Sequence, residues 1–126
     1  MSDYVSFEVA KLLKEKGYKQ SFDESHYEYG DDGNSYWYSC IGAYDIVDNV
    51  TNRYERPRIT YPCPTLWETQ KWLRRERNIH IVIYHSSDWN HTICNISENE
   101  WLSEGYDFDT YEEALNEGIK EALNLL

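Results

Sequence analysis

The sequence predicts an α+β fold, in which three helices pack on a mostly antiparallel sheet of about four to five strands that includes two hairpins. Apolar residues recur at helical spacing in three segments, and they alternate with polar residues around two turn signals. This order of segments is typical of a two-layer arrangement. At 126 residues the chain fits one domain, 1–126. The predicted helices cover about 6–16, 66–77 and 110–125.

The first predicted helix carries one apolar stripe and a clear stop. Gly17 followed by Tyr18 is typical of a Schellman motif, in which glycine takes the left-handed conformation after the last turn. Apolar residues recur every three or four positions, so they form one stripe that faces the core. It consists of Val5, Val9, Leu12 and Leu13.

The first hairpin is predicted over 26–41. Its strands flank a Gly-Asp-Asp-Gly-Asn segment, and the Asp-Gly pair favours a tight turn. Tyrosines alternate along both strands, and aromatic cross-strand pairs contribute a few tenths to about 1 kcal/mol each. Between 42 and 58 the pattern weakens to one short apolar segment with turn signals. A further short strand is expected at 58–61.

The second helix has the most complete signals at its two ends. Thr65 and Glu68 have the spacing of a capping box, and Asn78 suits a left-handed stop. Basic residues crowd the C-terminal half, where the helix dipole favours cations. Trp67 and Trp72 lie about 140° apart around the helix, since each residue turns it by about 100°. We therefore expect Trp72 in the core and Trp67 half-exposed.

A second hairpin is predicted over 79–97. Ile79, Ile81 and Ile83 alternate with more polar residues, which is the period of a strand. The segment 86–90 is turn-like, and a return strand is expected at 91–96. The segment 97–107 is acidic and has no regular period.

The last helix has the clearest helical stripe in the chain. Thr110 and Glu113 repeat the capping-box spacing. Gly118 lies inside the stripe, where glycine costs about 1 kcal/mol relative to alanine. We expect it to allow close approach of the helix to a neighbouring backbone or a large ring.

Composition limits the classes of function. The net charge is −11, and 78–126 carries ten acidic side chains and one basic side chain. An acidic surface repels nucleic acid and anionic membranes, which argues against binding to either. No leader or membrane-length apolar run is visible, so we expect a soluble, cytoplasmic protein. Three widely spaced cysteines (Cys40, Cys63 and Cys94) are expected to be reduced and structural.

Three motifs resemble a family of proteins. They are VSFEVAKLLKEKG at 5–17, PTLWETQKWLR with NIHI at 64–81, and TYEEALNEGIKEAL at 110–123. Together they resemble a family of small uncharacterised proteins encoded in phages, prophages and gut anaerobes. The resemblance implies an origin on a mobile element, and it implies no activity, cofactor or catalytic residue. The matching residues are also those that the fold needs.

The best candidate metal site is formed by His85, His91 and Cys94, with His80 and Asp88 nearby in sequence. Imidazole and thiolate are good zinc ligands. If 86–90 is the loop of a hairpin, His85 and His91 lie opposite each other. The alternative interpretation places the histidines at the surface beside a turn, because strand alternation splits the set between two faces. On that interpretation, the chain holds no metal or cofactor.

No catalytic residue is assigned. Cys94 with a histidine, or Cys40 with His26 across the first hairpin, would be a nucleophile pair. No phosphate-binding loop, nucleophile elbow or H-E-x-x-H motif occurs, which favours a protein that is not an enzyme.

The remaining candidate is a surface on the second helix. Trp67 shares one side of it with Lys71, Arg74 and Arg75. The basic side chains are expected to cover the indole. The alternative is an interaction surface that stacks on nucleic-acid bases or contacts phosphates. The leading hypothesis is a non-enzymatic accessory protein that binds a protein partner or forms a homo-oligomer. The alternatives are an acidic mimic of DNA that inhibits a host DNA-binding protein, and a small Cys/His-dependent enzyme or metal-binding protein.

Overall fold

The computed structural model describes residues 3–20, 25–38, 44–46, 52–53 and 59–126. Backbone contacts group the chain into two compact units. The N-terminal unit comprises Ser6–Pro64, and the C-terminal unit comprises Met1–Val5 with Thr65–Leu126. No helix in the described ranges is both long enough and apolar enough to cross a membrane.

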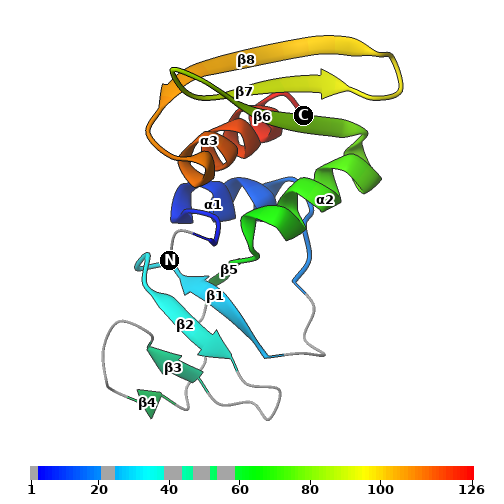
Figure 1. The fold of residues 1–126 in the computed structure, drawn as a ribbon. Helices are drawn as coiled ribbons and strands as arrows, with labels where there is room; N and C mark the ends of the chain where they lie inside the picture. The colour runs from blue at the N-terminus through cyan, green and yellow to red at the C-terminus, as the bar shows by residue number, and fades with distance from the viewer. Residues whose placement is uncertain (1–2, 21–24, 39–43, 47–51, 54–58) are drawn as a thin grey trace. The chain divides into compact units, whose positions relative to one another are not determined.

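The N-terminal unit consists of one helix and an antiparallel sheet (Figure 1). The strand order is β4-β3-β2-β1-β5. In the central pair, His26 lies opposite Tyr38 and Tyr29 opposite Ser35. The elements are α1 (Phe7–Glu15), β1 (His26–Gly30), β2 (Ser35–Tyr38), β3 (Tyr44–Ile46), β4 (Asn52–Arg53) and β5 (Thr60–Pro62).

Both ends of α1 are capped, and the C-terminal stop is the one that the sequence predicts. The Ser6 hydroxyl accepts a hydrogen bond from the Val9 amide at 3.3 Å. At the other end Gly17 has a φ of 91°, and the Tyr18 amide donates to the Leu13 carbonyl at 2.9 Å. This is the predicted Schellman motif.

The first hairpin is held by polar bonds at its turn and by aromatic pairs along its strands. The Asp32 carboxylate accepts the Tyr36 hydroxyl at 2.7 Å and the Asn34 amide at 2.9 Å, and these bonds lower the pKa of Asp32. The rings of the cross-strand partners Tyr27 and Trp37 lie 4.8 Å apart. The aromatic alternation in the sequence thus corresponds to real pairs.

The helix α1 packs on this sheet through Phe7. Its ring lies 5.5 Å from the Tyr29 ring and 5.4 Å from the Tyr61 ring, between centroids. Gly33 in the turn leaves room beside the same ring. An aromatic cluster therefore provides the contact between helix and sheet in the N-terminal unit.

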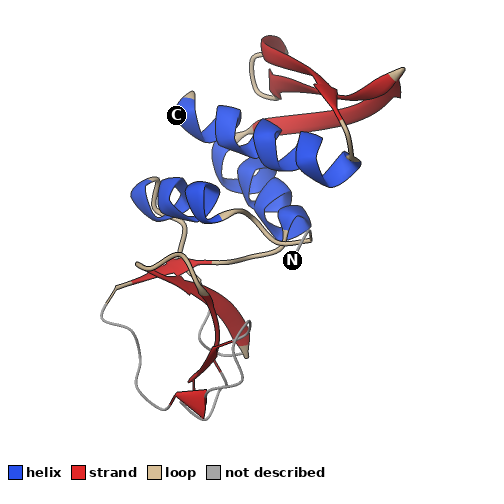
Figure 2. Cartoon of the chain, turned by 90° about the vertical axis from the view of Figure 1, so that its left-hand side faces the viewer, coloured by secondary structure: helices blue, strands red, loops and turns tan. Residues whose placement is uncertain are grey.

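The C-terminal unit consists of two helices and a three-stranded antiparallel sheet of order β6-β7-β8. Figure 2 shows the helix α3 running along one side of this sheet. The elements are α2 (Leu66–Arg77), β6 (Ile79–Ser86), β7 (Asp88–Asn95), β8 (Glu100–Phe108) and α3 (Tyr111–Asn124).

The capping boxes of the two helices differ. In α2, Thr65 accepts the Glu68 amide and Glu68 accepts the Thr65 amide, so the predicted box is complete. In α3, the Thr110 hydroxyl accepts the Glu113 amide at 3.1 Å. The Glu113 carboxylate instead accepts the amide of Asp109, one residue before the cap. Asn78 ends α2 with a φ of 57°, as predicted.

The α+β class, the three helices and the two hairpins are confirmed, whereas the arrangement of strands differs from the prediction. The strands fall into two sheets, where one sheet was expected. The segment 97–107, predicted to be irregular, contains most of β8, whose bulges break the alternation. The second hairpin turns at Ser87 alone, with a φ of 68°, so the predicted 86–90 loop is wrong. That residues 1–126 form a single domain remains a prediction.

Candidate functional site

The sheet β6–β8 has one face covered by α3. Ile81 and Ile93 are cross-strand partners, and both are buried on this face. Gly118 of α3 approaches Ile81 and His91 closely. The Ser103 hydroxyl of β8 donates to the Glu121 carboxylate of α3 at 3.4 Å. These contacts identify the side of the sheet to which α3 belongs.

The alternate residues of the same strands form the opposite face, called the open face below. The register pairs Val82 with Thr92, Thr92 with Glu104 and Cys94 with Trp101, which continues one face across all three strands. Side chains of successive strand residues point to opposite faces, so none of these faces α3. The large side chains of the open face are Tyr84, Trp101, Glu104 and Tyr106.

Three aromatic side chains of the open face are exposed. Tyr84 is 37% exposed, Tyr106 54% and Trp101 68%. They come from the two outer strands, Tyr84 from β6 and the other two from β8. Because aromatic side chains lose favourable burial when they face water, such a group on one face is a candidate contact surface.

Glu104 and Tyr106 are bonded to each other on this face. The Tyr106 hydroxyl donates to the Glu104 carboxylate, which raises the pKa of Tyr106, and nearby Tyr84 adds to the rise. The tyrosine thus stays protonated at neutral pH and holds the carboxylate beside its ring. The open face combines aromatic rings with a negatively charged group that is bonded to one of them.

His91 lies on the face of the sheet that α3 covers, and its polar ring contacts that helix. It is 3% exposed, and its Nδ1 lies 3.1 Å from the Ala114 carbonyl oxygen. Its ring stacks on Phe108 with centroids 5.3 Å apart. Burial lowers the pKa of His91, although the Ala114 carbonyl and the carboxylates of Glu121 and Glu117 act in the opposite direction. The imidazole is therefore a structural group, neutral at pH 7.

The structure separates the predicted metal ligands. His85 lies opposite Trp89, and not opposite His91 as predicted, because the hairpin turn is shorter than expected. His91 lies on the α3 side, whereas Cys94 lies on the open face. Within the described residues, no three His, Cys, Asp or Glu side chains are grouped closely enough to hold a metal ion.

Of the two predicted nucleophile pairs, the structure describes both members only for the pair that contains Cys94. Cys94 lies opposite His80, and its thiol donates to the His80 carbonyl at 3.7 Å. The His80 Nδ1 is buried without a hydrogen-bond partner among the described residues. No bond joins this thiol to the imidazole in the described part of the chain, and Cys40 of the other pair lies outside it. Cys63 is buried.

The predicted surface on α2 is present as a helix face. Trp67 is 43% exposed, Lys71 and Arg75 are exposed, and Arg74 is half-buried. Trp72 is half-buried, with the Arg77 guanidinium 5.5 Å from the ring centroid. Trp72 is thus more exposed than the core position that was expected.

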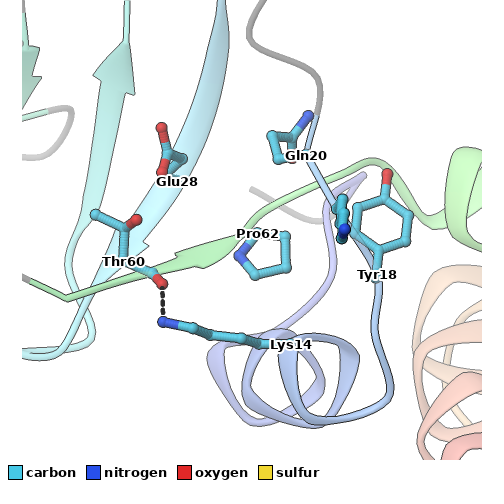
Figure 3. Close-up of a pocket in the computed structure, with 7 residues that line it drawn as sticks. Lys14, Tyr18, Gln20, Glu28, Thr60 and Pro62 are labelled. Carbon is cyan, nitrogen blue, oxygen red and sulfur yellow. Dashed lines mark hydrogen bonds between the residues drawn. The ribbon is translucent and has the colours of Figure 1, made fainter.

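The N-terminal unit contains a pocket of about 370 Å³ beside α1 and β5 (Figure 3). The Lys14 ammonium at its edge donates to the Thr60 carbonyl at 2.8 Å. Glu28 is 2% exposed and bonded to His26 at 2.9 Å, and the buried Gln20 Oε1 has no partner in the described ranges. Because the lining mixes ammonium groups with a carboxylate, it selects no single charge, and we assign it no ligand.

Comparisons with protein families, with characterised proteins and with solved structures found no match. The resemblance to small phage-encoded proteins therefore remains a prediction. The carboxylates that a DNA mimic would use are divided between the two units, in 23–32 and 98–113.

Sequence reasoning missed the open face, because it did not recognise β8. The acidic residues and the glycine of 100–108 are uncommon in strands. The irregular pairing of β8 near Cys94 also places Trp101 on the same face as Glu104 and Tyr106, so strict alternation does not reveal this face.

Proposed function

We propose that this chain is a non-enzymatic protein-binding domain, and that the open face of β6–β8 is its binding surface. The observation that carries the proposal is the exposure of Tyr84, Trp101 and Tyr106 on the one face of this sheet that α3 does not cover. A sheet face that had no partner would ordinarily present polar side chains to water.

The residue types support a protein partner. Tyrosine and tryptophan are enriched at protein interfaces, and they supply most of the binding energy at the centre of such contacts. Both have few rotatable bonds, so they lose little entropy when they are bound. The separation of the candidate ligands His91 and Cys94 onto two faces also favours binding over metal-dependent catalysis.

A selection from a library of displayed random peptides tests the proposal without assuming a partner. We expect the full chain to enrich related sequences. Synthetic versions of them should bind at least tenfold more weakly when Trp101 or Tyr106 is replaced by alanine, since interface aromatics contribute about 1–2 kcal/mol or more.

The matched control is Trp67→Ala, which removes an exposed tryptophan from α2 in the same unit. It should leave the affinity unchanged. The proposal is wrong if no related peptides are enriched, or if the selected peptides lose affinity through Trp67→Ala and not through Trp101→Ala.

A further inference from the structure

We infer that the partner presents an extended basic segment, rich in Arg and Lys, which binds along the open face. This inference rests on the proposed function and adds the chemistry of the partner. It follows from the charge, the ring chemistry and the shape of the same surface.

The charge around the open face has one sign. Residues 79–108, which form the whole sheet and its turns, contain five acidic side chains and no Lys or Arg. Glu104 lies on the face itself, and the exposed Asp88 begins β7 at one end of it. Complementary charge accelerates association and excludes partners of the wrong sign, so this face attracts cationic segments and repels phosphate groups.

The aromatic rings add a reason to expect arginine and lysine in particular. Cations bind the faces of aromatic rings, tryptophan most strongly, and a guanidinium also stacks on them through its plane. Trp101 offers the most exposed ring of the three, at 68%. Beside Tyr106, the bonded Glu104 carboxylate is placed to pair with a guanidinium that lies on the phenol ring.

The surface is elongated, which indicates an extended occupant. Trp101 and Tyr106 lie five residues apart on the same strand, a separation of roughly 15 Å at about 3.3 Å per residue. About five residues of an extended segment span that distance, with alternate side chains directed at the sheet. A helical segment with the same number of residues would span only about half that distance.

A binding assay with designed peptides tests the inference on the full chain. We would measure, by fluorescence anisotropy, the affinity for a flexible peptide in which Arg and Lys alternate with small residues. The comparison peptides have the same length, with Glu or Ser at the basic positions. We expect the basic peptide to bind at least tenfold more tightly than either, and its affinity to fall as salt screens the charges.

Two matched variants separate specific contact from general attraction. Glu104→Gln and Glu76→Gln each remove one negative charge from the C-terminal unit, but Glu76 is an exposed residue of α2. Glu104→Gln should weaken the basic peptide about fivefold, as expected for a charge-assisted bond at a partly exposed site. Glu76→Gln should change the affinity less than twofold.

Each of several results would overturn the inference. The first is equal affinity for the three peptides, and the second is an equal loss in the two glutamine variants. The third is concentration-dependent self-association that Trp101→Ala abolishes, because the face would then be covered by a second copy. If displayed peptides are enriched and depend on Trp101 but are neutral or acidic, this inference fails while the proposed function stands. If none is enriched, both fail.

Discussion

Gly105 of β8 lies directly against the imidazole of His91, so closely that a Cβ at position 105 would overlap the ring. The ring cannot move aside easily, because it is bonded to the Ala114 carbonyl and stacked on Phe108. The position of β8, and with it the open face, therefore depends on a residue without a side chain at 105.

Replacing Gly105 with alanine should destabilise the protein by about 1–3 kcal/mol, the usual cost of overpacking a core. Urea unfolding followed by tryptophan fluorescence measures this. Gly118→Ala is the comparison: its Cβ would lie 3.0 Å from Ile81 Cγ2 and 3.2 Å from His91 Cγ. Alanine there also gains about 1 kcal/mol of helix propensity. The net loss of unfolding free energy should therefore be smaller in Gly118→Ala than in Gly105→Ala. A larger loss in Gly118→Ala would contradict the proposed packing.

The buried His91 should make stability depend on pH. Its pKa in the folded state is lowered below the value of 6.5 expected in the unfolded chain. The unfolded state therefore binds a proton first, so stability is full above about pH 6.5 and falls as the pH decreases through that value towards the lowered pKa. The slope is at most about 1.4 kcal/mol per pH unit.

Urea unfolding at pH 7.5 and at a series of values down to pH 5.5 measures this slope. His91→Gln should be less stable at pH 7.5 but should remove much of the slope. The control His85→Gln changes an exposed histidine and should leave the slope intact. A slope that survives in His91→Gln would assign the titration to other groups.

The sequence predicted elements that depend on local signals. The cap at Thr65 and the stops at Gly17 and Asn78 involve bonds between residues a few positions apart, so a single segment contains the whole signal. Gly118 was expected to approach a backbone or a large ring, and the structure places the side chains of Ile81 and His91 against it.

The register and the sheet arrangement were not predictable in the same way. A turn at Ser87 alone, and not a loop over 86–90, changes the partner of His85 from His91 to Trp89. Bulges near His91 and Cys94 shift the pairing with β8, so strict alternation fails there. These features depend on contacts between strands, which no single segment specifies, and the predicted position of His85 opposite His91 was wrong for that reason.

The capping bond of Thr65 should have a measurable contribution. Thr65→Ala leaves the Glu68 amide without its hydroxyl acceptor at 3.1 Å, and should lower the free energy of unfolding by about 1 kcal/mol. Thr65→Ser keeps the hydroxyl and should restore most of that loss. If serine and alanine are equally destabilising, the methyl group and not the cap accounts for the effect.

Zinc should not stabilise the protein through the predicted ligands. Because His91 and Cys94 lie on different faces of the sheet, a stoichiometric amount of Zn²⁺ should leave the thermal unfolding midpoint unchanged. Differential scanning fluorimetry of protein without a histidine tag measures this. A rise in the midpoint that Cys94→Ser abolishes would show that these residues come together after all.

The most direct test of the open face is a map of backbone amide chemical shifts on the full chain, recorded as the basic peptide is added. The largest changes should lie at Tyr84, Trp101, Glu104 and Tyr106, with little change in α2. Changes concentrated instead around Trp67, Lys71 and Arg74 would place the binding surface on α2 and contradict the central claim.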